Sequence, residues 1–232
     1  MGATAASATT NRATSRGRID KRQAILDAAF AVFASRGYAR ACMEEIAEVA
    51  GVAKHTVYNH LGDKENLFRA AMEATGNAVM AENLVVAERL TVEGGEGPDP
   101  VRSSLQDVGH RLLLQCCDDR SWALRRLLHA EITRFPELLE VVWGRGADRL
   151  RQTLADRMAR LSLAGLLRPC DPVEASEQFL ALLTGPMEAR SQLGTRHVPD
   201  SELHTVADAA VDTFLRAFRT DHPSPAATVA AP

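Results

Sequence analysis

The chain has 232 residues, 46% hydrophobic and 25% charged, a composition typical of a globular protein and unlike that of a disordered, collagenous or fibrous chain. Its formal net charge of −3 excludes an overall basic excess that would point to nucleic acid or a membrane surface. The charge is unevenly placed, however, because residues 1–68 hold nine basic and seven acidic residues whereas residues 69–232 hold 18 and 23. The N-terminal end is therefore basic and the rest of the chain acidic.

Targeting and redox signals are weak throughout the chain. No stretch of about 18 apolar residues predicts a membrane span, and the N-terminus lacks the pattern of a signal peptide. The cysteines show no metal-type spacing and no even framework, which favours a reduced, cytoplasmic protein. They are Cys42, Cys116, Cys117 and Cys170. Residues 1–19 and 221–232 are rich in small and polar residues or proline, and we expect both to be disordered tails.

Between the tails the hydrophobic residues recur with a period of 3.6, so the sequence predicts an all-α protein. Asp20, Asp99 and Asp171 stand at capping positions before predicted helices, and prolines follow the last two. Gly37 is expected to end the first helix, and Gly185-Pro186 to kink the penultimate one. Helices are expected over residues 20–36, 43–50, 54–60, 64–89, 101–117, 120–134, 136–163, 173–193 and 201–219.

The segment from Met43 to His60 has the residue types of two short helices joined by a tight turn. Small Ala47 lies where such helices cross, and Gly51 supplies the positive φ that the turn requires. In a helix-turn-helix the second helix enters the major groove, where hydrogen-bonding side chains reach base edges and phosphates. The candidates are Lys54, His55, Thr56, Tyr58, Asn59 and His60. An ordinary helical hairpin with a polar outer face is the alternative.

A longer pattern at fixed spacing surrounds this segment. It comprises Ile25-Leu26-x-Ala28-Ala29-x-x-x-Phe33, Gly37-Tyr38, Met43-x-x-Ile46-Ala47-x-x-Ala50-Gly51-Val52, Thr56-Val57-Tyr58-x-His60 and Lys64-Glu65-x-Leu67-Phe68. The pattern resembles the tetracycline-repressor (TetR) family of transcriptional regulators. Segments 131–139 and 177–185 also resemble the ligand-binding half of one common subgroup. The resemblance implies a dimer that binds an approximately palindromic operator, usually to repress, and that a small molecule releases.

The resemblance also assigns roles by position. It implies that Lys54, Thr56, Tyr58 and His60 contact mainly the DNA backbone, that His55 and Asn59 read bases, and that Lys64 meets a phosphate. The chain departs from the family at Ala41-Cys42, Ala53 and Leu61, where the family usually has Thr-Ser or Thr-Thr, Ser and Phe. Because hydroxyl groups at helix starts cap the helix, their loss predicts weaker operator binding than is usual in the family.

Residues 64–219 hold no glycine-rich phosphate loop, no Gly-x-Ser-x-Gly elbow and no His-Glu-x-x-His motif, so we expect no enzyme, cofactor or metal site. Aromatic and methionine side chains on long helices predict a pocket for a small, mostly apolar effector. The candidate ligand-binding residues are Met80, His110, Leu113, Trp122, His129, Trp143 and Phe179. Plain core packing is the alternative for each of them.

The last predicted helix carries an apolar stripe in steps of three and four residues. The resemblance implies that this helix and the preceding one form a four-helix dimer interface. The alternative is that the last helix closes its own domain. The candidate interface residues are Phe179, Leu183, Met187, Val206, Ala210, Phe214 and Phe218.

Together these observations predict a three-helix helix-turn-helix DNA-binding domain at residues 20–65 and a helical effector-binding and dimerisation domain at residues 66–220. The expected function is that of a homodimeric, cytoplasmic repressor whose partners are double-stranded DNA and a small-molecule effector. One rival is a helical ligand-binding module with weakened or lost operator binding. A small α-helical enzyme is a second and less favoured rival.

Overall fold

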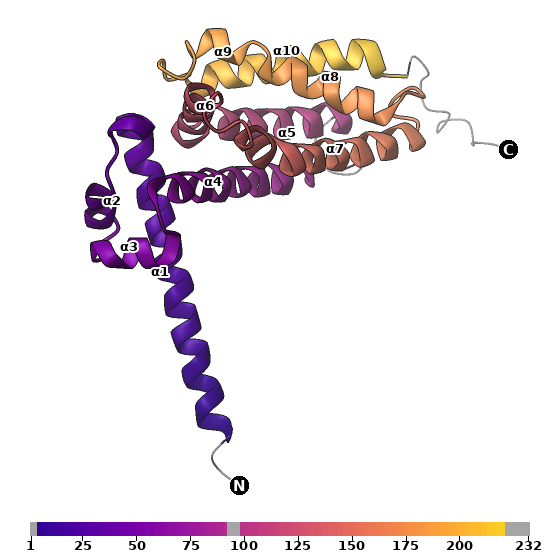
Figure 1. Ribbon diagram of the computed structural model, residues 1–232. Coiled ribbons are helices and arrows are strands. Elements are labelled where there is room, and N and C mark those ends of the chain that lie inside the picture. Colours follow the sequence, from indigo (N-terminus) through magenta and orange to yellow (C-terminus); the bar gives the residue numbers. More distant parts are fainter. Residues whose placement is uncertain (1–3, 92–97, 221–232) are drawn as a thin grey trace, which may run out of the picture. The chain divides into compact units, whose positions relative to one another are not determined.

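The computed structural model describes residues 4–91 and 98–220, apart from the side chains of residues 4–18, 141, 143 and 145. These ranges form helices and turns with no β-strand among them, which confirms the all-α prediction (Figure 1). The helices are α1 (Thr4–Arg40), α2 (Met43–Val49), α3 (Lys54–Leu61), α4 (Lys64–Ala87), α5 (Pro100–Cys116), α6 (Asp119–Glu131), the π-helix η1 (Glu140–Gly144), α7 (Arg145–Leu163), α8 (Pro172–Thr184), α9 (Met187–Arg190) and α10 (Asp200–Phe218). None of the described helices has the length and apolar character needed to cross a membrane.

The first helix differs most from its prediction at its N-terminal end. Helix α1 begins at Thr4, so it includes Asp20 as an interior residue and not as a cap. Residues 4–19, which the sequence predicts to be a disordered tail, are helical in the structure. Their alanine-rich, proline-free sequence is compatible with a continuous helix. Gly37 does interrupt the helix, with φ +74° and ψ 160°, as predicted. The predicted C-terminal tail, residues 221–232, lies outside the described residues.

Two long predicted helices differ in detail from the structure. The helix predicted over residues 136–163 begins two residues later: residues 138 and 139 are helical, η1 follows directly, and α7 continues to Leu163. The predicted kink at Gly185-Pro186 is confirmed, since α8 ends at Thr184 and only the short α9 follows. Gln192 and Leu193 then adopt φ values of +51° and +57°, which no helix continues through.

The described residues group into two compact units. The first unit combines Met1–Asn77 with Leu124–Val142, and the second combines Ala78–Ala123 with Trp143–Pro232. Helix α4 begins in the first unit and ends in the second, and so the predicted domain boundary at residue 65 does not coincide with the boundary between units. The sequence pattern of the first three helices gives no reason to add residues 124–142 to them.

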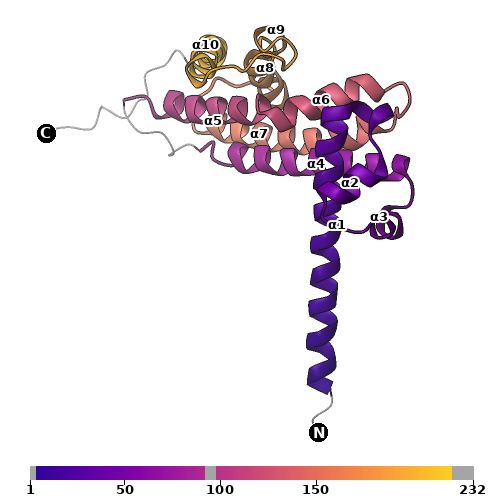
Figure 2. The same cartoon turned by 90° about the vertical axis from the view of Figure 1, so that its left-hand side faces the viewer.

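The second unit is built around α5, α7, α8 and α10. Helix α10 packs against α5 and α8, and α7 packs against α8 (Figure 2). Asp99 and Asp171 cap α5 and α8 as predicted, accepting hydrogen bonds from the N–H groups of Arg102 (3.3 Å) and Val173 (2.9 Å). The buried core of these helices includes Leu105, Leu154, Met158, Phe179, Leu183 and Phe214.

Candidate DNA-binding site

The turn between α2 and α3 is fixed by Gly51, which has φ +66°. The N–H of Gly51 donates to the carbonyl of Glu48 (3.1 Å), and the N–H of Val52 donates to that of Ala47 (3.0 Å). This pair of bonds is a Schellman motif, whose left-handed residue glycine adopts without strain. The predicted positive φ at Gly51 is confirmed, and α2, the turn and α3 form the expected helix-turn-helix.

A seam of buried apolar side chains between α2 and α3 determines which face of α3 is exposed. Ile46 and Ala47 of α2 and Val57 of α3 are at most 4% exposed, and Leu61 is buried at the end of α3. Because these side chains hold one face of α3, the opposite face is left to solvent. Its side chains include six of the sequence candidates: Lys54, His55, Tyr58 and Asn59 are exposed, and Thr56 and His60 are half-buried.

Lys54 is the first residue of α3, and its ammonium group is paired with the carboxylate of Glu44 on α2. The same ammonium lies 5.7 Å from the centre of the Tyr58 ring. The hydrogen bond with Glu44 raises the pKa of Lys54, and the hydrogen bond with Lys54 lowers the pKa of Glu44. Both groups therefore stay charged at neutral pH. To contact a phosphate, the Lys54 ammonium must break its ion pair with the Glu44 carboxylate.

Lys64, the other predicted phosphate contact, stands at the start of α4. Its Nζ donates to the carbonyl of Ala39 (3.1 Å) and lies 4.7 Å from the centre of the Tyr38 ring. Lys64 therefore joins the start of α4 to the end of α1. Sequence spacing could not show this, because Ala39 is 25 residues away.

A group of four aromatic rings, which we call the Tyr38 cluster, joins three segments of the first unit. Tyr38 of α1 lies edge-on to Phe68 of α4 (4.9 Å between ring centres) and to Phe135 (5.1 Å), and Phe33 lies edge-on to Phe68 (4.9 Å). Burial is the main cause that raises the pKa of Tyr38. Residue 135 thus packs on the helix-turn-helix side of the chain, which explains why segment 124–142 belongs to the first unit.

Two arginines cover the Tyr38 cluster and pair with acidic residues. The Arg134 guanidinium lies 4.5 Å from the centre of the Tyr38 ring and donates to Glu65 (2.9 Å). Arg69 lies 4.8 Å from the centre of the Phe135 ring and donates to Glu137 (2.6 Å). These contacts bind the start of α4 to residues 134–137. They were missed at the sequence level, because nothing in the local pattern of 131–139 indicates its partner.

The two residues that depart from the family pattern at helix starts leave their helices without a side-chain cap, as expected. Cys42 and Ala53 are the N-cap residues of α2 and α3, with extended backbones, and neither side chain accepts a capping hydrogen bond. An extended N-cap is the geometry in which a serine hydroxyl would cap the helix.

The predicted ligand-binding residues are divided between the two units. His129 is exposed on α6 in the first unit, whereas the others belong to the second. There Leu113 and Phe179 are fully buried, with Phe179 against Gly109, Trp122 packs on Gly194 and Met80 packs on Gly146. His110 lies beside His204 of α10. The side chain of Trp143 lies outside the described part of the chain.

The predicted dimer-interface residues lie in the core of the single chain. All seven are 4% exposed or less: Phe179, Leu183, Met187, Val206, Ala210, Phe214 and Phe218. The apolar stripe of α10 thus packs on α5 and α8, which is the alternative that the sequence left open. A groove lies between α8 and α10. It is lined by Gln178, Ala181, Leu182, Thr213, Phe214, Ala217 and Phe218.

Comparisons with known proteins agree with this geometry. A family model described as bacterial regulatory proteins, tetR family, matches residues 25–71, and one described as AefR-like transcriptional repressor, C-terminal domain, matches residues 103–220. The HTH-type transcriptional repressor AcnR of Corynebacterium glutamicum is 27% identical over 192 residues, which cover 83% of this chain and 93% of the relative.

Two solved structures extend the likeness over most of the chain. A TetR-family transcriptional regulator from Mesorhizobium loti is 30% identical, with a TM-score of 0.77, and the match covers 88% of this chain and 98% of the other. A TetR-family regulator from Pseudomonas syringae pv. tomato is 25% identical, with a TM-score of 0.60 and coverage of 88% and 98%. The chain belongs to the TetR family of transcriptional regulators.

Proposed function

We propose that this chain acts as a homodimeric repressor that binds an inverted-repeat operator through α3 and releases it when a small molecule binds the second unit. The observation that carries the proposal is the exposed polar face of α3, held outward by the buried seam with α2. The repressor relative AcnR, which matches over most of its length, supports the direction of regulation.

The side chains of α3 divide by their chemistry. The Asn59 amide and the His55 imidazole are exposed, and each carries the donors and acceptors that read base edges in the major groove. Lys54, Thr56, Tyr58 and His60 suit phosphate oxygens, which fix the register of the helix without reading sequence. Lys64 is a weaker candidate, because its ammonium already joins Ala39 to α4.

The groove between α8 and α10 is the surface that we propose for the second copy. Small side chains, Ala181 on α8 and Thr213 and Ala217 on α10, are exposed along it and allow two helices to approach closely. A two-fold axis over this groove would place the same residues of both copies against one another. Phe214 and Phe218, two of the predicted interface residues, also line the groove and stay among the expected contacts.

The coupling that we propose runs through elements that belong to both units. Helix α4 and helix α6 each have residues in the first unit and in the second. The Tyr38 cluster fastens the start of α4 and residues 134–137 to the end of α1. An effector that displaced α4 or α6 would therefore move the helix-turn-helix, provided that it bound the two states with different affinity.

The identity of the effector stays open, but the second unit offers a starting point. The side-chain oxygens of Gln115 and Ser121 are buried and have no hydrogen-bond partner among the described residues. A buried polar atom without a partner costs about 1–3 kcal/mol, which a ligand that donates a hydrogen bond would offset. We propose these two residues as polar contacts of the effector.

Selection from a pool of random DNA duplexes, at about physiological salt, tests the proposal. Two inverted half-sites should be enriched. Asn59→Ala should relax the preference at one base position by about 1–3 kcal/mol, whereas Lys54→Ala should weaken binding to all sequences and reduce the salt slope by about one. His129→Ala, an exposed change in the same unit, is the control and should alter neither. A folded, dimeric protein that enriches no duplex would favour the rival, a ligand-binding module without an operator.

A further inference from the structure

We propose that His110, Asp200 and His204 form a binding site for a divalent transition-metal ion such as Zn²⁺, joining α5 to α10 within the second unit. One ligand atom of each of these three residues lies within 4.8 Å of the other two. The sequence predicts no metal site for want of a metal-binding motif, and His110 and Asp200 are 90 residues apart along the chain. The spacing of Asp200 and His204, four residues apart on one helix, is the signal that could have drawn attention to them.

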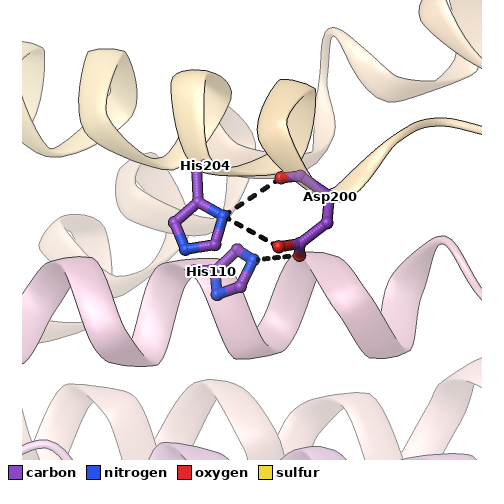
Figure 3. A group of neighbouring side chains, drawn as sticks. All are labelled: His110, Asp200 and His204. Carbon is purple, nitrogen blue, oxygen red and sulfur yellow. Dashed lines mark hydrogen bonds and ion pairs between the residues drawn. The ribbon is translucent and has the colours of Figure 1, made fainter.

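The two imidazole rings converge on a single carboxylate (Figure 3). His110 Nε2 lies 2.8 Å from Asp200 Oδ1, and His204 Nδ1 lies 3.3 Å from Asp200 Oδ2 and 3.1 Å from the backbone carbonyl oxygen of Asp200. In a tetrahedral zinc site with bonds of about 2.0–2.1 Å, neighbouring ligand atoms are about 3.4 Å apart. Both distances to the carboxylate are shorter than this, so the side chains must move apart to admit the ion.

The position of the three residues follows from the way α5 and α10 pack. Contacts between the two helices repeat every four residues, with the numbers rising along α5 and falling along α10. The first two contacts in this row pair Arg102 with Asp212 and Gln106 with Asp208. In both pairs a donor on α5 faces a carboxylate on α10. The next step along the same row pairs His110 with His204, and Asp200 follows one turn further along α10.

This third step of the row differs chemically from the first two. Two imidazoles face each other with ring centres 3.4 Å apart, and each turns a nitrogen toward the Asp200 carboxylate. An imidazole that is neutral can present a lone pair to a metal ion, and a carboxylate oxygen supplies the third ligand. Two histidines with one carboxylate suit zinc, nickel, copper or cobalt better than magnesium or calcium, which prefer all-oxygen sites.

The surroundings leave the site accessible to an ion from solvent. The Asp200 and His204 side chains are 63% and 55% exposed, whereas His110 is 16% exposed and so anchors the site on α5. The positive end of the α10 dipole disfavours a cation at Asp200, and the carboxylate offsets that effect. Of the charges next along α10, Glu202 is already paired with Arg190 and Arg196. With three protein ligands, the fourth position would hold water.

Zinc titration of the full-length protein tests the site. The protein is prepared without a polyhistidine tag, stripped with a chelator, and titrated with Zn²⁺ against a chromophoric competitor; Co²⁺ then serves as a spectroscopic probe. We expect one ion per chain. His204→Gln and Asp200→Asn should each weaken binding by about tenfold or more. His197→Gln, an exposed histidine outside the cluster, should leave the affinity unchanged.

The cysteines are the competing source of metal binding, and a second variant addresses them. The double variant Cys116→Ser, Cys117→Ser should bind zinc as the original chain does, and the cobalt complex should lack thiolate charge-transfer absorption. Circular dichroism confirms that each variant is folded. The proposal is overturned if His204→Gln binds zinc as tightly as the original chain, if the double cysteine variant loses the site, or if no saturable uptake occurs.

Discussion

At the scale of single residues, the two helices of the DNA-binding motif begin without a side-chain cap. Cys42 and Ala53 hold the extended backbone of N-cap residues, yet neither offers a hydroxyl to the free N–H groups of the first turn. Those N–H groups are the same ones that bind phosphate at a helix start. The stability of α2 and α3 and their hold on DNA are therefore expected to be lower than serine caps would allow.

Replacing these two residues tests that expectation. Cys42→Ser and Ala53→Ser should each stabilise the protein by about 1 kcal/mol and strengthen operator binding. Ala31→Ser, at an exposed position inside α1, is the control and should destabilise by about 0.5 kcal/mol, because serine has the lower helix propensity. The measurements are thermal melting and a binding titration with a selected duplex. Unchanged melting and affinity in both cap variants would show that the missing hydroxyls do not matter.

The ion pair between Lys54 and Glu44 has a second consequence for DNA binding. Glu44→Gln removes a negative charge beside the phosphates and frees the ammonium of Lys54, so the affinity for duplex DNA should rise, by up to about fivefold for an exposed pair worth no more than about 1 kcal/mol. Glu48→Gln on the same helix removes an equal charge and serves as the control. Fluorescence anisotropy at low and high salt gives both affinities. Equal gains in the two variants would assign the effect to net charge alone.

What the sequence predicts at this scale is the identity of the exposed residues, and not their partners. The period of α3 and its glycine turn place Lys54, His55 and Asn59 on the outer face. The pairing of Lys54 with Glu44 depends on the angle between α2 and α3, and the bond from Lys64 to Ala39 depends on the fold of the first unit. Neither follows from spacing along the chain.

At the scale of helices, starts with a strong local signal were predicted well, and an irregular segment inside a helix was not. Asp-Pro pairs before α5 and α8 supply the cap and the first helical residue in adjacent positions, and both helices begin there. The predicted break between residues 134 and 136 is present, because turns surround Phe135, which is buried in the Tyr38 cluster. The π-helical segment η1 inside the following helix was not predicted.

Asp99 links a helix cap to an ion pair, and the two roles can be separated. It caps α5 and pairs with Arg219 after α10; the hydrogen bond from Arg219 is the main cause that lowers the pKa of Asp99. Asp99→Asn keeps a cap and should cost about 0.5–1 kcal/mol at neutral pH, whereas Asp99→Ala loses both roles and should cost about 1–2 kcal/mol.

The pH dependence of these variants follows from the lowered pKa. The ionised Asp99 contributes its stability above the unfolded pKa of about 3.9, and that stability is lost as the pH falls through the lower folded pKa. The difference between the original chain and Asp99→Asn should therefore shrink below about pH 4. Urea unfolding at neutral and acidic pH measures it. An equal cost of the asparagine and alanine variants at neutral pH would argue that Asp99 does not act as a cap.

At the scale of the whole molecule, hydrophobic periodicity identified the stripe of α10 but could not tell what covers it. A stripe buried by its own chain and one buried by a second copy look the same in sequence. Phe214 and Phe218 are at most 4% exposed in the single chain and also line the groove, so the contacts proposed for the dimer add the small exposed residues along it. The likeness to the family, carried mainly by residues 25–71 and 103–220, predicts the function more directly than any pattern in the second unit.

The most direct test asks whether two copies of α3 read one operator together. Binding is measured on the selected inverted repeat, whose half-sites should be about one helical turn apart, and on the same duplex with half a turn inserted between them. The original chain and the control Gln152→Arg should sediment as dimers and lose most of their affinity on the altered duplex. Thr213→Arg, which places a charge in the groove between α8 and α10, should sediment as a monomer and bind both duplexes equally weakly. Equal affinity of the original dimer for the two duplexes would contradict the proposed paired reading of the operator.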